Sequence, residues 1–209
     1  MDRGRTITLA SRNAKKAVEL RALVGDGWDV RGLGDCPGVP EVEEDGATFL
    51  ENAAKKAVEV SRHVVGLVLA DDSGLEVDAR GGAPGGLSAR FAGNHGDDAS
   101  NNAMLLGRLD GVAAEGRGAQ FRCVLALARS GEVLFTCEGV CRGWIGFAAR
   151  GERGFGYDPL FVPEWEVSRE GGTLRFGRTF AEIGAEEKNR RSHRARAMDL
   201  LRNRLADLG

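Results

Sequence analysis

Hydrophobic and polar positions alternate along this chain with two different periods, and the change of period marks the expected strands and helices. Alternation over residues 6–10 predicts a strand, because successive side chains of a strand face opposite sides. Apolar residues then recur at positions 17, 20 and 24, the spacing of one helix face, and alternation resumes over residues 28–33. The first 35 residues therefore predict a strand–helix–strand unit that contributes to a sheet.

A second helix is predicted from Thr48 to about residue 63. Thr48 is followed three residues later by Glu51, the capping-box pattern in which each side chain bonds the backbone of the other residue. An unbroken apolar run over residues 64–70 comes next, which is typical of a strand covered on both faces. This run stops at Asp71 and Asp72, and we expect the strand to end there.

The remaining pattern predicts helices and an antiparallel hairpin. A helix is expected near residues 98–109, and two alternating segments over 121–127 and 133–137 flank a Ser-Gly turn. A last helix begins near residue 186 and carries an apolar face. The residues of that face are Met198, Leu201, Leu205 and Leu208. Parallel and antiparallel segments together predict an α/β protein with a long, mixed, twisted sheet flanked by helices.

Composition narrows the functional classes. Of 209 residues, 42% are hydrophobic and 29% are charged, which suits a folded globular protein rather than a disordered chain. Lys and Arg number 29 and Asp and Glu 31, so the net charge of −2 provides no overall field for nucleic acid or an anionic membrane. No apolar run approaches the roughly 18 residues of a membrane span. We expect a cytoplasmic protein with neither a nucleic-acid nor a membrane partner.

Four cysteines occur without a CxxC motif, so reduced structural thiols are favoured over a metal site or a disulfide. They are Cys36, Cys123, Cys137 and Cys141.

The acidic pair Asp71-Asp72 is the first candidate for chemistry, because carboxylates at the end of a buried strand face the usual ligand crevice of an α/β sheet. Adjacent strand residues point apart, so one carboxylate would face a divalent cation while the other holds a neighbour. A turn over residues 72–74 without any ligand is an equally good interpretation. Further carboxylates lie over residues 41–45, just before Gly46. An oxygen-rich cluster suits Mg²⁺ or Mn²⁺. Taken alone, however, this segment is explained more simply as a solvated acidic loop. Its carboxylates are Glu41, Glu43, Glu44 and Asp45.

Residues 11–16 form the complementary cationic candidate. This segment connects the first strand to the first helix, so free backbone N–H groups together with Lys15 and Lys16 can hold phosphate oxygens. It lacks the Walker A pattern, and by itself a solvated helix start is the simpler interpretation. Combined with the acidic pair and Lys56, however, it suits the binding of a metal-chelated polyphosphate.

Six segments in order resemble the inosine triphosphate pyrophosphatase family, Ham1-like hydrolases that remove non-standard purine nucleoside triphosphates from the nucleotide pool. The resemblance spans nearly the whole chain. The segments are residues 9–20, 44–53, 69–75 (LADDSGL), 81–91, 154–161 (GFGYDPLF) and 179–194.

The resemblance implies Mg²⁺-dependent hydrolysis of ITP, dITP or XTP to the nucleoside monophosphate and pyrophosphate, with Mn²⁺ as a possible substitute. Glu44 and Asp72 match the metal-side carboxylates of the family, Asp72 also matches the general base for water, and Asp71 supports it. The residues matched to phosphate binding are Ser11, Asn13, Lys15, Lys16, Lys56 and Ser73.

The base pocket implied by the resemblance comes from the C-terminal half, with Phe155 as the stacking ring. A 6-oxo purine presents acceptors that suit cationic donors, whereas adenine presents an amino group there, which gives a physical reason to reject ATP. The residues matched to this pocket are Phe155, Gly156, Tyr157, Asp158, Lys188, His193 and Arg194.

The architecture implied is one domain over residues 1–209, with two lobes, a substrate groove between them and antiparallel hairpins at roughly 115–165. The family precedent is a homodimer. The sequence departs from the family in two motifs: Ser11-Arg12 replaces a common Thr-Gly, and Gly184-Ala185 replaces a Ser-Pro that starts a helix. The latter predicts a weaker helix cap. The charged stretch 164–177 is longer than expected and has no assigned role.

Two other functions remain open from the sequence. A non-catalytic sensor would bind purine triphosphates without hydrolysis, and a Mg²⁺-dependent phosphatase would release only the terminal phosphate and leave a diphosphate.

Overall fold

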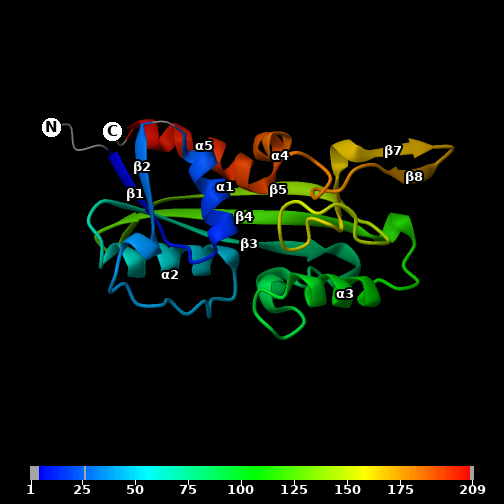
Figure 1. The fold of residues 1–209 in the computed structure, drawn as a ribbon, viewed down its shortest axis with the longest axis horizontal. Helices are drawn as coiled ribbons and strands as arrows, with labels where there is room; N and C mark the ends of the chain where they lie inside the picture. Colours follow the sequence, from blue (N-terminus) through cyan, green and yellow to red (C-terminus); the bar gives the residue numbers. More distant parts are fainter. Residues whose placement is uncertain (1–4, 26, 208–209) are drawn as a thin grey trace. The chain divides into compact units, whose positions relative to one another are not determined.

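A six-stranded mixed sheet with the strand order β2-β1-β3-β4-β5-β6 forms the centre of the fold (Figure 1). The computed structural model describes residues 5–25 and 27–207. The strands are β1 (Arg5–Leu9), β2 (Trp28–Gly32), β3 (Leu67–Val77), β4 (Gly118–Arg129), β5 (Glu132–Ile145) and β6 (Phe161–Pro163), with β7 (Val167–Glu170) and β8 (Thr173–Phe176) in a separate hairpin. The helices are α1 (Ala14–Val24), α2 (Phe49–Ser61), α3 (Asp98–Arg108), α4 (Ala185–Arg191) and α5 (His193–Asp207).

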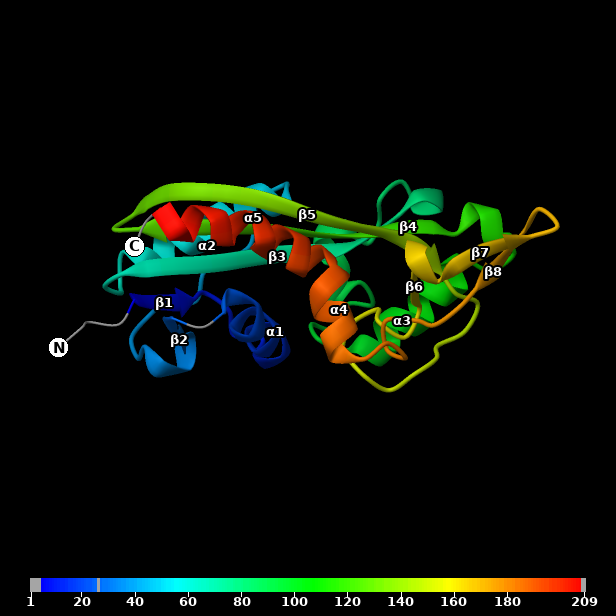
Figure 2. The ribbon, with the colours of Figure 1, turned by 90° about the horizontal axis from the view of Figure 1, so that it is seen from above.

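Parallel and antiparallel pairs both occur, as the sequence predicts. β1 pairs in parallel with β2 on one side and with β3 on the other, which makes β2 an edge strand (Figure 2). β5 and β6 pair antiparallel. The turn between β4 and β5 uses Ser130 at φ 54° and Gly131 at φ 83°, the left-handed conformations that a two-residue hairpin turn needs.

The described chain divides into two compact units. The first contains the described residues up to Asp72, Cys123–Gly139 and the described residues from His193 onward. The second contains Ser73–Arg122 and Val140–Ser192. Strands β3, β4 and β5 each contribute residues to both units. Within the described residues, no helix is long and apolar enough to cross a membrane.

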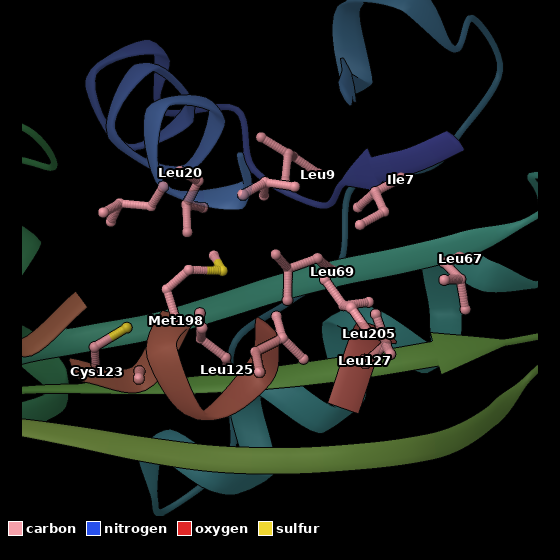
Figure 3. Packing of buried hydrophobic residues seen from close by; sticks show 14 of the residues in the cluster. Ile7, Leu9, Leu20, Leu67, Leu69, Cys123, Leu125, Leu127, Met198 and Leu205 are labelled. Atoms are coloured by element: carbon pink, nitrogen blue, oxygen red, sulfur yellow. The ribbon is translucent and has the colours of Figure 1, made fainter. Parts of the chain in front are cut away.

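Both faces of β3 are covered in the first unit, as its unbroken apolar run predicts. Leu67 and Leu69 pack into a cluster with residues of α1 and α5, which Figure 3 shows from close by. Val68 and Ala70 face the other way, into a cluster with residues of α2. The two-residue period of the strand therefore sorts neighbouring side chains into two different environments.

The second unit has its own core, which includes a group of packed aromatic rings. Phe161 lies 4.7 Å from Phe121 and 4.9 Å from Phe180 between ring centroids. The stretch over residues 164–177, which the sequence leaves without a role, forms a short 3-10 turn followed by the β7–β8 hairpin. Arg178 bonds Glu166 at the base of this hairpin and closes it.

The expected end of β3 at the acidic pair is wrong. The strand begins at Leu67 instead of residue 64 and continues through Asp71 and Asp72 to Val77, so no turn forms over residues 72–74. The reason is long-range pairing: β1 pairs with β3 only as far as Leu69, whereas β4 is the neighbour of β3 on its other side. Residues 71–74 form a polar sequence that resembles a turn, but pairing with the neighbouring strand β4 keeps them extended.

The single C-terminal helix expected from the sequence is also wrong, because Ser192 has an extended backbone that separates α4 from α5. Met198, Leu201 and Leu205 are buried as predicted, while Leu208 lies outside the described residues. Gly184 is the N-cap of α4 and makes no side-chain hydrogen bond there, and the weaker cap expected from the sequence stays a prediction. The Thr48–Glu51 capping box is present at the start of α2. The four cysteines are free thiols.

Replacement of Gly139 by alanine should lower the free energy of unfolding. A Cβ there would overlap the carbonyl oxygen of His193 and the amide nitrogen of Ala197, both of them backbone atoms. We expect a loss of about 1–3 kcal/mol, as for overpacking in a core, measured by urea denaturation. Gly107→Ala is the matched control, because its Cβ meets open space in α3 and should stabilise the helix slightly. Equal free energies of unfolding for Gly139→Ala and Gly107→Ala would contradict the close approach of Gly139 to the backbone of α5.

Candidate functional site

Asp71 and Asp72 point to opposite faces of β3, as the predicted division of the pair requires. Asp71 Oδ2 lies 3.3 Å from Nζ of Lys16 and 3.2 Å from the guanidinium of Arg194. Asp72 Oδ1 lies 4.0 Å from Nζ of Lys56, on the face that packs against α2. One carboxylate thus belongs to the α1 and α5 side and the other to the α2 side.

The end of β1 explains why these groups meet. The ladder between β1 and β3 stops at Leu9 opposite Leu69, and Asp71 follows two residues later along β3. The chain leaves β1 there and enters α1, whose first turn supplies Lys16. In α/β sheets, ligands bind outside the carboxyl ends of parallel strands, and β1 has such an end beside Asp71.

Asp71 is a buried anion surrounded by cations. Burial alone raises the pKa of Asp71, but Lys16, Arg194 and Lys56 outweigh it and hold that pKa well below its usual range. Arg194 is itself almost fully buried and also pairs with Glu19 of α1. The result is a chain of alternating charges across β3, α5 and α1, in which Asp71 and Arg194 are buried and Lys16 and Glu19 are half-buried.

Asp72 has the opposite electrostatic character. Burial raises the pKa of Asp72, Glu44 raises it further, and the lowering effects of Lys56 and Lys16 do not fully compensate. A carboxylate with a raised pKa accepts a proton more readily, which is the property of a general base. Two adjacent aspartates therefore have opposite shifts, because the strand sends them into different surroundings.

Lys56 connects the acidic loop with β3. Its ammonium donates to Oε1 of Glu44 at 3.0 Å and to the backbone oxygen of Asp71 at 2.6 Å. Burial lowers the pKa of Lys56, but the carboxylates of Asp71, Asp72 and Glu44 outweigh it and raise that pKa overall. Lys56 therefore stays charged, with the side chains of Glu44 and Asp72 both within 4.0 Å of its nitrogen.

Asn52 and Glu19 are residues of this cluster that the sequence analysis does not assign to it. Asn52 Oδ1 accepts from the backbone N–H of Gly46 at 2.7 Å, and its side chain bonds Asp72. It therefore ties the acidic loop to the strand. A Cβ on Gly46 would lie 2.7 Å from this same oxygen, which requires glycine there. Gly46 and Asn52 flank the Thr48–Glu51 capping box, and this short spacing is the feature of the sequence that points to their contact.

The backbone N–H groups expected to receive phosphate at the start of α1 are partly occupied. Asn13 Oδ1 accepts from the N–H of Lys15 at 3.0 Å and of Lys16 at 3.1 Å, so Asn13 is the N-cap of the helix. Ser11 Oγ accepts from the N–H of Asn13 at 3.3 Å. The interpretation of these N–H groups as free is therefore wrong, since a capping side chain satisfies them.

In the second unit, the residues around Phe155 form a second cluster. Asp158 Oδ2 accepts from the N–H of Phe155 at 2.9 Å and from Nζ of Lys188 at 2.6 Å. Lys188 Nζ also lies 5.1 Å from the ring centroid of Phe155. Tyr157 is buried and donates its hydroxyl to the backbone oxygen of Ser88. The buried ion pair thus holds the loop that carries the predicted stacking ring.

The predicted residues fall into the two units separately. His193 and Arg194 begin α5 in the first unit, where both are buried, whereas Ser73 belongs to the second unit. Arg194 bonds two carboxylates in this structure, and its predicted role in base recognition stays a prediction.

The fold and the first cluster define a class: an α/β protein in which buried lysines and carboxylates gather beyond a parallel strand, a setting suited to phosphate oxygens. Residues 7–204 match the model of the Ham1 family, and the chain belongs to this family. The resemblance inferred from its motifs is thereby confirmed.

Curated relatives cover almost the whole chain. It is 49% identical over 194 residues to a protein named dITP/XTP pyrophosphatase from Desulforamulus reducens, covering 92% of this chain and 91% of that one. It is 51% identical over 203 residues to a protein of the same name from Pseudomonas syringae pv. tomato, covering 95% and 96%.

Among solved structures, a HAM1 protein from Coxiella burnetii has a TM-score of 0.82 at 36% identity, covering 97% of this chain and 99% of that one. The structure of the Staphylococcus aureus Ham1 protein also has a TM-score of 0.82, at 34% identity, with coverage of 98% and 100%. These similarities confirm the predicted α/β class with a mixed sheet.

Asparagine at the two positions of the acidic pair should have different effects on stability: a loss at position 71, and no loss at position 72. The lowered pKa of Asp71 means that its ionised form stabilises the folded state above its unfolded pKa, a contribution lost as pH falls through the folded pKa. Asp71→Asn should lower the free energy of unfolding at pH 7 by about 3 kcal/mol, as for a broken buried ion pair.

The raised pKa of Asp72 has the reverse sign, so its charge costs stability above the folded pKa. Asp72→Asn should keep or increase stability at pH 7, and any gain should vanish as pH falls below the unfolded pKa. Urea denaturation of both variants in EDTA at several pH values is the measurement. A destabilised Asp72→Asn variant at pH 7 would contradict the assigned environments.

Proposed function

We propose that this protein hydrolyses dITP, ITP and XTP to the nucleoside monophosphate and pyrophosphate, and so clears non-standard purine triphosphates from the nucleotide pool. The observation that carries the proposal is the divided acidic pair, which sets a proton-accepting carboxylate and a fixed anion beside two lysines. The names of the curated relatives, dITP/XTP pyrophosphatase, support the same substrates.

Hydrolysis of a phosphoanhydride loads negative charge onto phosphate oxygens, so catalysis is mainly positioning and electrostatic stabilisation. Lys15, Lys16 and Lys56 supply positive charge toward the triphosphate, and Ser11, Asn13 and Ser73 are the further candidates for phosphate contact. Asp72 accepts the proton of the attacking water. Asp71 keeps Lys16 in place through its ion pair. The oxygen of water forms a new P–O bond at the anhydride bridge between the α and β phosphates, one P–O bond of that bridge breaks, and the nucleoside monophosphate and pyrophosphate are released.

Glu44 and Asp72 are the residues that would hold Mg²⁺, or Mn²⁺ in its place. Their carboxylates approach the same point, since both lie within 4.0 Å of Lys56 Nζ. In the described part of the chain, no group of three or more acidic, histidine or cysteine side chains is arranged to hold a metal. Mg²⁺ in nucleotide sites takes one or two carboxylates and completes its shell with water and phosphate oxygens, which fits this pair. When bound, the metal would neutralise charge on the phosphates.

Base selection belongs to the second part of the proposal. Phe155 stacks on the purine, with Gly156, Tyr157 and Asp158 shaping the loop, and Lys188, His193 and Arg194 are the candidate donors to the 6-oxo group. An adenine amino group cannot accept from such donors, which disfavours ATP. A homodimer in the cytoplasm is part of the same proposal, on the strength of the family resemblance.

Product analysis tests the function. We expect dITP and XTP with Mg²⁺ to give the monophosphate and pyrophosphate, and ATP to react far more slowly, as measured by ion-exchange chromatography with a pyrophosphatase-coupled phosphate assay. Asp72→Asn should abolish turnover while dITP still binds, since an amide is a poor base. A diphosphate product would instead indicate a phosphatase, and binding without hydrolysis by the wild type would indicate a sensor.

Removal of the stacking ring should weaken all purine substrates alike. Phe155→Ala is expected to lower kcat/KM for dITP and ATP by similar factors, equivalent to roughly 1–3 kcal/mol, because every purine has a π-face. Phe147→Ala is a matched control, since Phe147 is an exposed ring of the same unit that stacks on Phe176.

Arg194→Ala should instead reduce the ratio of dITP to ATP turnover. If Phe155→Ala changed this ratio more than Arg194→Ala, the two roles in base binding would be wrong.

A further inference from the structure

Two side chains of helix α3 bond the backbone N–H and the backbone oxygen of Gly156. Asp98 Oδ2 accepts from the N–H of Gly156 at 2.9 Å, and Asn102 Nδ2 donates to the oxygen of Gly156 at 2.9 Å. Asp98 and Asn102 are four residues apart, so they lie one above the other on a single helix face. Two side chains of one helix turn thereby satisfy both polar groups of one residue, 54 to 58 positions away in the sequence.

These bonds fix the direction in which Phe155 leaves the backbone. The N–H that Asp98 holds belongs to the peptide bond that follows Phe155, while the N–H of Phe155 itself is held by Asp158 at 2.9 Å. Both peptide planes that flank the Cα of Phe155 are therefore anchored. Gly156 has a φ of 60°, a left-handed conformation that glycine adopts without strain, and this conformation is kept by the same contacts.

The neighbouring residue, Asp97, caps the N-terminus of α3. Its Oδ1 accepts from the N–H of Ser100 at 3.0 Å and its Oδ2 from the hydroxyl of Ser100 at 2.7 Å, so Asp97 is the N-cap of α3. Asp98 is therefore not the N-cap, and its side chain bonds the loop that carries Phe155. The chain itself supplies a matched pair of adjacent carboxylates, one for helix stability and one for the loop.

We propose that Asp98 and Asn102 are positioning residues for purine recognition, which act through Gly156 to hold Phe155 in the orientation that stacks on the base. This inference rests on the proposed function. According to this inference, α3 influences how tightly the base binds and does not affect the phosphate contacts of the first unit.

The test compares Asp98→Ala, Asp98→Asn and Asp97→Ala with dITP as substrate and inorganic triphosphate as a competitive inhibitor that lacks a base. Loss of one hydrogen bond to a half-buried backbone group should raise KM for dITP about tenfold in Asp98→Ala, with a smaller change in kcat. The inhibition constant of triphosphate should stay within about twofold of wild type, because the substitution removes no contact to a phosphate.

The two comparison variants separate positioning from stability. Asp98→Asn keeps an acceptor oxygen for Gly156, so it should restore KM to near the wild-type value. Asp97→Ala should lower Tm through the lost cap but leave KM unchanged. If Asp98→Ala does not fold, Asn102→Ala removes the other bond and should raise KM with the same unchanged inhibition constant.

Three results would overturn the inference: a KM for Asp98→Ala equal to that of Asp97→Ala, an Asp98→Asn variant as impaired as Asp98→Ala, or a triphosphate inhibition constant that rises in parallel with KM. Wild-type protein that fails to hydrolyse dITP would instead refute the proposed function, and this inference with it. Wild-type hydrolysis with unaffected Asp98→Ala kinetics would refute the positioning role alone.

Discussion

The buried ion pair between Asp71 and Arg194 is the interaction on which the first unit depends, because it joins β3 to α5 while Lys16 and Glu19 attach α1 to the same charges. Charges taken out of water are tolerated only when each has a partner and good geometry. The alternation of carboxylate and cation meets that condition. Because each ion pair joins two different elements, the four charges together hold β3, α1 and α5 to one another.

The same two-residue period that packs the core also creates the chemistry. Leu67 and Leu69 face α1 and α5, and Asp71 continues that side of β3. Val68 and Ala70 face α2, and Asp72 continues the other side. A single continuous strand therefore delivers one carboxylate to a cationic surrounding that lowers its pKa and the next to a buried surrounding that raises it. A turn at this position would not have sorted the pair in this way.

Strongly periodic segments were predictable from the sequence, and contacts between distant segments were not. The alternation of β1, the capping box of α2 and the Ser-Gly hairpin turn are local features, so their elements appear as expected. The extended conformation over residues 71–74 depends on pairing within the sheet, and the break at Ser192 leaves no mark in the apolar spacing that follows it. The role of Asp98 arises from a bond to the backbone of Gly156, 58 positions away, which no local residue pattern encodes. The predicted substrate groove stays a prediction.

The chemistry of the two clusters also explains how selectivity can be separated from catalysis. Lysines and carboxylates recognise charge, and every nucleoside triphosphate presents the same charged chain, so the first cluster cannot by itself distinguish one base from another. Discrimination under the proposed function must therefore come from groups that meet the purine. Under that function, Phe155 would supply affinity without selectivity, because stacking accepts any purine. Donors to the 6-oxo group would then supply the selectivity, since a mismatched amino group leaves buried polar groups unpaired. Under the same proposal, the bonds from Asp98 and Asn102 to Gly156 would orient Phe155 for every purine alike, so the choice between bases would rest with the donors.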